Sequence, residues 1–321
     1  MVSIGRSEDG VLPFSLSSSQ IRGRLVKLGT SLNQALKNHS YPPLIQQLMG
    51  ELMALGVMLA STIKYEGKLT LQTNSDGLVK VMLVDITSAG LIRGYASFDK
   101  RSEKDFIFDQ DSQHISIVEI MGNGHIAFTV DQGAEMERFQ GIVSLEGDTL
   151  SSCARHYFMQ SEQIETDIFL TAGYYKGIIR SGGLMLQRMP DSQNKDGVMK
   201  PSQPIGGSVR QKEGLSNFEE DWNRATILMN SVKNRELLDP KIDAQSIVYR
   251  LFHLDGVRGY PEREIRFGCH CSRERVIATL SNFSQVEISN MFVDGKITVK
   301  CQFCNSEESF TQQSIDASIL N

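Results

Sequence analysis

Apolar residues recur at two different periods along the first half of the chain. Between residues 19 and 64 they return every three or four positions, which is the period of an α-helix. The break Tyr41-Pro42-Pro43 divides this stretch. The pattern therefore predicts two core helices, carried by Ile21, Leu25, Leu28 and Leu32 and by Leu44, Leu48, Leu52 and Leu55.

From residue 67 the period changes to two, as expected for half-buried strands. Turn sequences at Asn74-Ser75-Asp76-Gly77 and Thr87-Ser88-Ala89-Gly90 divide residues 67–98 into an antiparallel meander. A second strand-rich stretch is expected over residues 114–145. It is followed by a helix at 148–160 and by strands at 166–170 and 184–189. Residues 1–190 therefore form a predicted α+β domain of antiparallel strand meanders packed with helices.

Composition changes at Pro190. Residues 191–214 contain few apolar side chains and several prolines and glycines, which predicts a flexible connector. An amphipathic helix follows, and a shorter helix comes after Asp239-Pro240. We interpret residues 191–254 as this connector plus a metastable helical linker, whose order depends on the domains on either side of it. The apolar face of the first linker helix consists of Phe218, Trp222, Ala225, Met229 and Val232.

Four of the five cysteines lie in the predicted C-terminal domain, residues 255–321. They form the pairs Cys269/Cys271 and Cys301/Cys304, separated by 29 residues. A C-x-x-C turn brings two sulfurs to one ion, and four thiolates complete a tetrahedral zinc shell without His270. The C-x-C half can also close into a strained, easily reduced ring when oxidised. We predict one Zn²⁺ at these cysteines, with reversible thiol chemistry, and an inert buried thiol at Cys153.

Composition narrows the classes of function. The 321 residues are 40% hydrophobic and 22% charged, which is ordinary for a globular protein of two domains. The longest apolar run, residues 52–60, is shorter than the ~20 residues of a membrane helix. No export signal is evident at the N-terminus, so a reducing cytoplasm is expected. The net charge is −5, and residues 255–321 carry seven Lys or Arg against nine Asp or Glu, which argues against nucleic-acid binding.

Other uses of a zinc or thiol site fit less well. A thiol oxidoreductase would place C-x-x-C at the start of a helix in a thioredoxin-like unit, but here a strand-like segment precedes it. A zinc-dependent transcription regulator is disfavoured by the acidic tail. A hydrolytic zinc keeps an open coordination position, which four thiolates would close. No phosphate-binding loop is present, so ATP-driven activity is not expected.

The cysteine pattern and several blocks elsewhere resemble one known family. The chain closely resembles the redox-regulated heat-shock protein 33 family of molecular chaperones from about Arg22 to Phe310. It departs from the family pattern at Glu308, where an aromatic residue is usual, and in its longer connector. The resemblance rests on Gly67–Gln72, Asp76-Gly77, Leu91–Ala96, Tyr157–Gln163, Gly182–Gln187, Cys269–Arg275 and Cys301–Cys304.

The resemblance implies an ATP-independent holdase and not an enzyme. Zinc on the four reduced cysteines would keep the chaperone inactive. Oxidation would pair Cys269 with Cys271 and Cys301 with Cys304, release zinc and unfold the tail. The linker would then open and bind unfolding client proteins, and the active form would be a homodimer. Arg273 and Arg275 are candidates for favouring the thiolate form of the cysteines.

Overall fold

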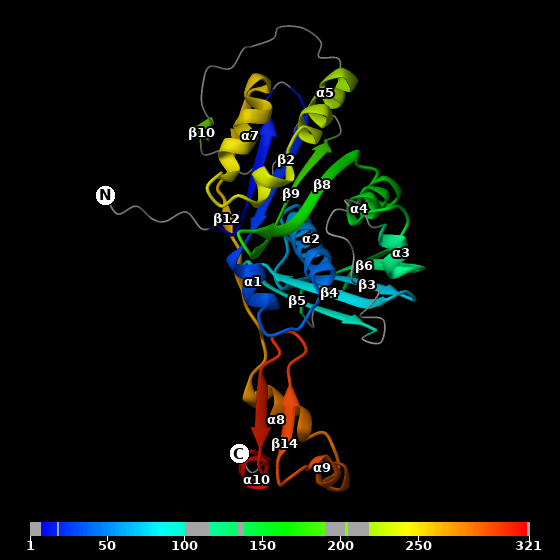
Figure 1. Ribbon diagram of the computed structural model, residues 1–321, viewed down its shortest axis with the longest axis vertical. Coiled ribbons are helices and arrows are strands. Elements are labelled where there is room, and N and C mark those ends of the chain that lie inside the picture. The colour runs from blue at the N-terminus through cyan, green and yellow to red at the C-terminus, as the bar shows by residue number, and fades with distance from the viewer. Residues whose placement is uncertain are drawn as a thin grey trace, which may run out of the picture.

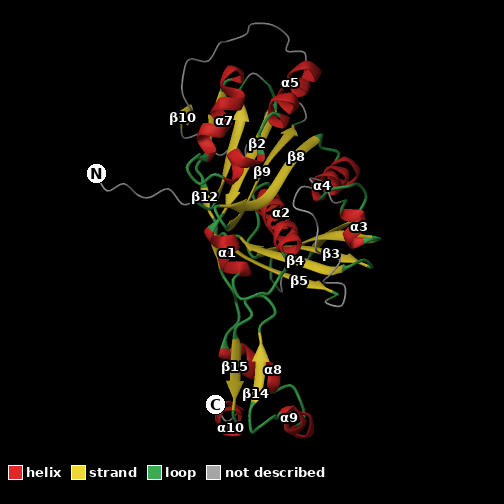
Figure 2. Ribbon diagram, viewed as in Figure 1, coloured by secondary structure: helices red, strands yellow, loops and turns green. Residues whose placement is uncertain are grey.

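Two largely antiparallel sheets enclose a long central helix, and the sheets with their helices are here called the body. A small C-terminal module projects from one end of the body (Figures 1 and 2). The computed structural model describes residues 8–17, 19–99, 116–133, 138–189, 203–204 and 218–319. Helices and strands share the chain without regular alternation, which confirms the predicted α+β class. Most of the predicted connector lies outside the described residues.

The first sheet has the strand order β10-β11-β1-β2-β9-β8, with β12 also paired to β1. Its long strands β1, β2, β9 and β8 are antiparallel neighbours. The strand bounds are Gly10–Leu16 (β1), Ile21–Leu28 (β2), Thr166–Tyr175 (β8), Ile178–Arg188 (β9), Gln203–Pro204 (β10), Val257–Gly259 (β11) and Arg263–Glu264 (β12).

The second sheet has the order β13-β5-β4-β3-β6-β7 and contains the predicted meander. The predicted strand-rich stretch begins differently, because Ser116 caps a short helix, α3 (Ile117–Met121), ahead of the strands. His114 lies outside the described residues. The strand bounds are Lys68–Ser75 (β3), Val79–Thr87 (β4), Leu91–Phe98 (β5), Gly124–Asp131 (β6), Phe139–Ser144 (β7) and Arg266–Phe267 (β13).

The core between the sheets is built on α2 (Pro43–Ala60), which confirms the second predicted helix. Its length and composition would suffice to cross a membrane, but 72% of it is buried inside the protein. The first predicted helix is wrong: residues 21–28 form strand β2, and only α1 (Thr30–Leu36) is helical. The helix predicted at 148–160 is present as α4 (Leu150–Tyr157), which continues as a π-helical turn, Phe158–Glu162.

The linker helices cover the opposite face of the first sheet. They are α5 (Phe218–Asn230), α6 (Asn234–Leu238) and α7 (Ala244–Phe252), and a 3₁₀ turn, His253–Asp255, follows them. The ring of Phe14 on β1 lies across Gly23 on β2, where an added Cβ would be 2.0 Å from it, and stacks on Phe252 at 5.6 Å. The linker is therefore ordered by the first sheet.

The C-terminal module contains α8 (Arg273–Leu280), α9 (Gln285–Met291), the hairpin β14 (Ile297–Lys300) and β15 (Glu307–Phe310), and α10 (Gln312–Ile319). It lies at the end of the molecule opposite α5 and α7 (Figure 1). The sequence predicts a linker whose order depends on both neighbouring domains, but the linker helices lie far from this module. Residues 256–267, here called the strap, join the two by running along both sheets as β11, β12 and β13.

Candidate metal centre

Two short backbone structures present the four cysteines. Cys269 follows β13, and Cys271 immediately precedes Ser272, whose hydroxyl accepts from the backbone N–H of Arg275 and caps α8. Cys301 and Cys304 form the turn of the β14–β15 hairpin. The N–H of Cys301 donates to Ser306 at 2.9 Å, so the hairpin hydrogen bonding continues through the first ligand position.

The sulfurs surround a single point. Cys269 Sγ lies 3.7 Å from Cys301 Sγ, and Cys271 Sγ lies 3.3 Å from Cys304 Sγ. All four sulfurs are within 4.8 Å of one another, and all four cysteines are free thiols. A tetrahedral zinc with Zn–S bonds of about 2.3 Å requires sulfurs roughly 3.8 Å apart. This cluster can therefore hold one metal ion, and its all-sulfur ligand set fits zinc.

The thiols differ in acidity when no metal is bound. Burial raises the pKa of Cys271 to about 12. Burial also raises the pKa of Cys304, but hydrogen bonds with Ser306, whose hydroxyl lies 2.8 Å from the sulfur, and with the thiols of Cys271 and Cys301 together outweigh it and lower the pKa to about 7. Burial lowers the pKa of His270, which stands outside the four-sulfur group. At the distant Cys153, burial raises the pKa to about 11, as expected for an unreactive thiol.

The two arginines next to the cluster are engaged with other groups. Arg273 pairs with Glu308 at 3.2 Å, and its guanidinium carbon lies 4.4 Å from the centre of the Phe310 ring. Arg275 donates to the carbonyl of His270 at 2.8 Å. The ion pair with Glu308 therefore links α8 to β15. The effect of the two arginines on the pKa values of the cysteines stays a prediction.

The C-x-x-C turn is also the contact between the module and the body. Phe303, between the two ligands, lies beneath the guanidinium of Arg93 on β5, 3.8 Å from ring centre to Cζ. His39 bonds the carbonyl of Phe303 at 2.9 Å, and Asn38 donates to that of Cys304 at 2.9 Å. The metal centre and the docking surface thus share one turn of four residues.

A buried carboxylate holds the arginine of this contact in place. Asp85 on β4 is only 3% exposed and accepts two hydrogen bonds from Arg93, at 2.8 and 2.6 Å. Thr70 donates to its other oxygen at 2.6 Å, and Lys68 lies 3.4 Å away. Because this network fixes the guanidinium plane, Arg93 offers a rigid surface to the aromatic ring.

The sequence analysis did not identify this docking site. The signal available for Phe303 was an aromatic residue between two metal ligands, but its partners lie in β4, β5 and the loop after α1. At the other end of the body, the linker face packs on the first sheet, and the side chain of Phe218 lies outside the described residues. The buried members of that face are Trp222, Ala225, Met229 and Val232.

Comparison with known proteins identifies relatives over nearly the whole chain. A family model described as Hsp33 protein matches residues 9–311. The 33 kDa chaperonin of Caulobacter vibrioides is 31% identical over 306 residues, which cover 94% of each chain. The 33 kDa chaperonin of Pseudomonas fluorescens is 34% identical over 299 residues, covering 92% of this chain and 89% of the relative.

A solved structure agrees with these relatives. The fold is similar to the crystal structure of the 33 kDa chaperonin, a heat shock protein 33 homolog, from Thermotoga maritima, with a TM-score of 0.74. That similarity covers 98% of both chains at 16% sequence identity, so it supports the fold alone. The family match and the curated relatives together show that this chain belongs to the Hsp33 family of chaperones.

Proposed function

We propose that this protein is a redox-regulated, ATP-independent holdase. In the reduced state one Zn²⁺ on Cys269, Cys271, Cys301 and Cys304 keeps it inactive. Oxidation of these thiolates releases zinc and exposes apolar surface that binds unfolding proteins. The observation that carries the proposal is the position of the sulfur cluster: its C-x-x-C turn also docks the module on the body.

The proposed oxidation balances with peroxide as the oxidant. Four zinc-bound thiolates, two hydrogen peroxide molecules and four protons yield Zn²⁺, two disulfides and four water molecules. We propose the pairs Cys269 with Cys271 and Cys301 with Cys304, as the resemblance to the Hsp33 family implies. Since zinc supplies much of the folding free energy of small metal modules, its loss would unfold the module.

Opening would reach the linker through the strap, because the module and the linker helices lie at opposite ends of the body. Gly268 donates to the carbonyl of Ile92 at 3.0 Å, so the strap is still paired with β5 one residue before Cys269. At its other end the strap follows Asp255, which pairs with Arg224 of α5. Unfolding of the module would free one end of this segment and weaken the linker from there.

The remaining assignments are part of the same proposal. Residues 1–190 are the chaperone domain, 191–254 the connector and linker, and 255–321 the redox switch, which contacts the body through the strap and through the C-x-x-C turn. We propose that the oxidised form is a homodimer in the cytoplasm. Its partners would be unfolding proteins, as for a chaperone of this family. Nucleic acid is not a proposed partner, because the net charge of −5 disfavours it. No catalytic turnover is proposed.

The test follows zinc and chaperone activity in one sample. The reduced, zinc-loaded chain is treated with peroxide at elevated temperature, and zinc release and the aggregation of thermally unfolding malate dehydrogenase are recorded together. One zinc per chain should leave as aggregation is suppressed, and reductant plus zinc should reverse both. Cys153→Ala should behave as wild type. Retention of zinc, or its loss without suppression of aggregation, would contradict the proposal.

The docking contact should set the ease of activation. Phe303→Ala removes the ring beneath Arg93 but leaves all four sulfurs, so zinc stoichiometry should be unchanged. A cation–π contact contributes about 0.5–2 kcal/mol, and we therefore expect activation by a fixed peroxide concentration to be several-fold faster. Gln302→Ala changes the exposed neighbour in the same turn and is the matched control. Equal activation rates for the two variants would show that docking does not restrain the switch.

A further inference from the structure

The strap occupies what would otherwise be a free sheet edge. One side of β1 pairs with β2 along its whole length. Among the described residues, the other side is covered by short pieces of the strap, with β11 opposite Phe14–Leu16 and β12 opposite Gly10–Val11. The register shifts by one residue between the two pieces, across the segment that contains Pro261. The edge of β1 is therefore paired with two short strands, β11 and β12, and not with one continuous strand.

Alternate residues of β1 direct their hydrogen-bonding groups at the strap. Tyr260 donates to the carbonyl of Pro13 at 2.9 Å, and Ser17 donates to that of Gly256 at 3.1 Å. Because antiparallel pairing alternates from one residue to the next, Ser15 also faces the strap, opposite Arg258. Once the strap leaves, these groups form an unpaired strand edge, which is a template for another extended chain.

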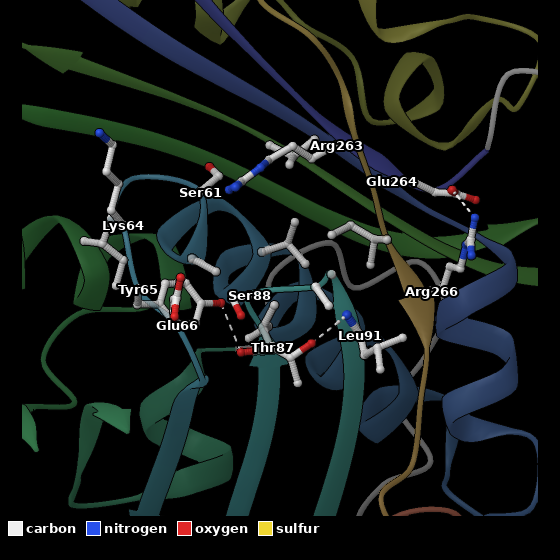
Figure 3. Close-up of a pocket in the computed structure, with 18 of the residues that line it drawn as sticks. Ser61, Lys64, Tyr65, Glu66, Thr87, Ser88, Leu91, Arg263, Glu264 and Arg266 are labelled. Atoms are coloured by element: carbon white, nitrogen blue, oxygen red, sulfur yellow. Dashed lines mark hydrogen bonds and ion pairs between the residues drawn. The ribbon is translucent and has the colours of Figure 1, made fainter. Parts of the chain in front are cut away.

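Side-chain packing beneath the strap is incomplete. A cavity of about 720 Å³ lies between the end of α2, the β4–β5 turn and strap residues Arg263–Arg266 (Figure 3). Val11 lines it from β1, and Ile265 lines it from the strap. Short strand pairs, a few further hydrogen bonds such as that between the hydroxyls of Ser15 and Tyr260, and buried side chains including Val257 and Ile265 keep this segment on the sheets. Such a region opens at lower free energy than the core around it.

We propose that an extended segment of an unfolding client adds to β1 as a strand, in the place that the strap vacates. Main-chain hydrogen bonds would supply affinity that does not depend on client sequence. Apolar side chains would take the positions of Val257, beside the face that the linker helices cover, and of Ile265, beside the cavity. This inference rests on the proposed holdase function and specifies its mode of client recognition.

Residue-resolved amide hydrogen exchange tests this edge. In the reduced chain the amides of Ser15 and Ser17 should be protected by the strap. They should exchange at least tenfold faster after oxidation and regain protection when unfolding malate dehydrogenase is added. The amides of Phe14 and Leu16 point toward β2 and should stay protected in all three states. They are the internal control on the same strand.

A peptide with the strap sequence 256–267 separates client addition from return of the strap. It is offered to the oxidised full-length variant Arg258→Pro/Tyr260→Pro, whose own strap lacks the two donors that face β1. N-methylation of the peptide at Arg258 and Tyr260 should weaken binding about tenfold or more, through two lost hydrogen bonds and a steric clash. N-methylation at Val257 alone, whose N–H group points away from β1 and lies outside the residues paired with β10, should change it little.

The outcomes separate this inference from the proposed function. If oxidised protein suppresses aggregation but client addition never restores protection at Ser15 and Ser17, clients bind elsewhere and the inference is wrong. Equal binding of the two methylated peptides would overturn it in the same way. In both cases the holdase function would stand. Absence of any suppression of aggregation would remove the proposed function and the inference together.

Discussion

Chelation of zinc from the reduced chain is expected to unfold the C-terminal module while both sheets of the body stay folded. The fully buried apolar core of the module, among the described residues, is small: Leu280, Ile288, Ile297, Phe310 and Ile315. So small a core stabilises a domain by only a few kcal/mol. Structural zinc contributes on the order of 10 kcal/mol at neutral pH, so its removal outweighs everything else that holds the module.

Amide hydrogen exchange with and without a strong chelator measures this directly. Amides in α8, α9 and the β14–β15 hairpin should lose protection, whereas those in α2 and β9 should keep it. Cys301→Ser should reproduce the loss without a chelator, and Cys153→Ser, at the thiol outside the cluster, is the matched control. A module that remains protected after zinc has left would show that its own apolar core is enough to keep it folded. Zinc release would then not be what opens the module.

Phe252→Ala is expected to open the linker while zinc stays bound. Phe252 is fully buried at the end of α7 and stacks on Phe14, at the centre of the contact between the linker helices and the first sheet. Replacing a buried phenylalanine by alanine costs about 3–5 kcal/mol. The remaining buried linker residues, among them Trp222, Met229 and Val248, would then have to keep the linker on the sheet without its central ring. We expect them not to suffice, so the reduced variant should suppress client aggregation without oxidant.

The control for this variant lies on the same helix. Tyr249 is 39% exposed, and Tyr249→Ala should leave the reduced protein inactive. Zinc content must be measured for both variants, because activity that accompanies zinc loss would be explained by the proposed activation through zinc release. If Phe252→Ala is destabilised but remains inactive with zinc bound, then the surface beneath the linker does not bind clients.

Zinc removal and Phe252→Ala are expected to start the opening at different ends of the strap. The module and the linker helices lie at opposite ends of the body and are joined by the strap. Zinc removal starts the opening at the Cys269 end of this segment, whereas Phe252→Ala starts it at the linker end. If zinc stays bound in the second case, opening of the linker does not require unfolding of the module.

Two strands of the first sheet, β1 and β2, were not predicted from the sequence, whereas the strands expected at 166–170 and 184–189 are present in β8 and β9. Residues 21–28 were predicted to be helical, but β2 has α2 on one side and the linker helices on the other. Apolar side chains are therefore buried on both faces, Leu25 on one and Val26 and Leu28 on the other, and the period of two is lost at the adjacent pair Leu25-Val26. The other strand, β1, contains Pro13. This proline is compatible with its position in the strand, because the N–H that proline lacks would point toward the strap and not toward β2.

The sequence by itself determined the parts of this protein that depend on local spacing. The four candidate metal ligands follow from two short turns, the meander from a period of two on a half-exposed sheet, and α2 from its leucine period. Only the tertiary structure decided that Phe303 packs under Arg93 and that the strap closes the edge of β1. Those contacts join residues about two hundred or more positions apart, and they depend on how the sheets pack, which a linear pattern does not contain.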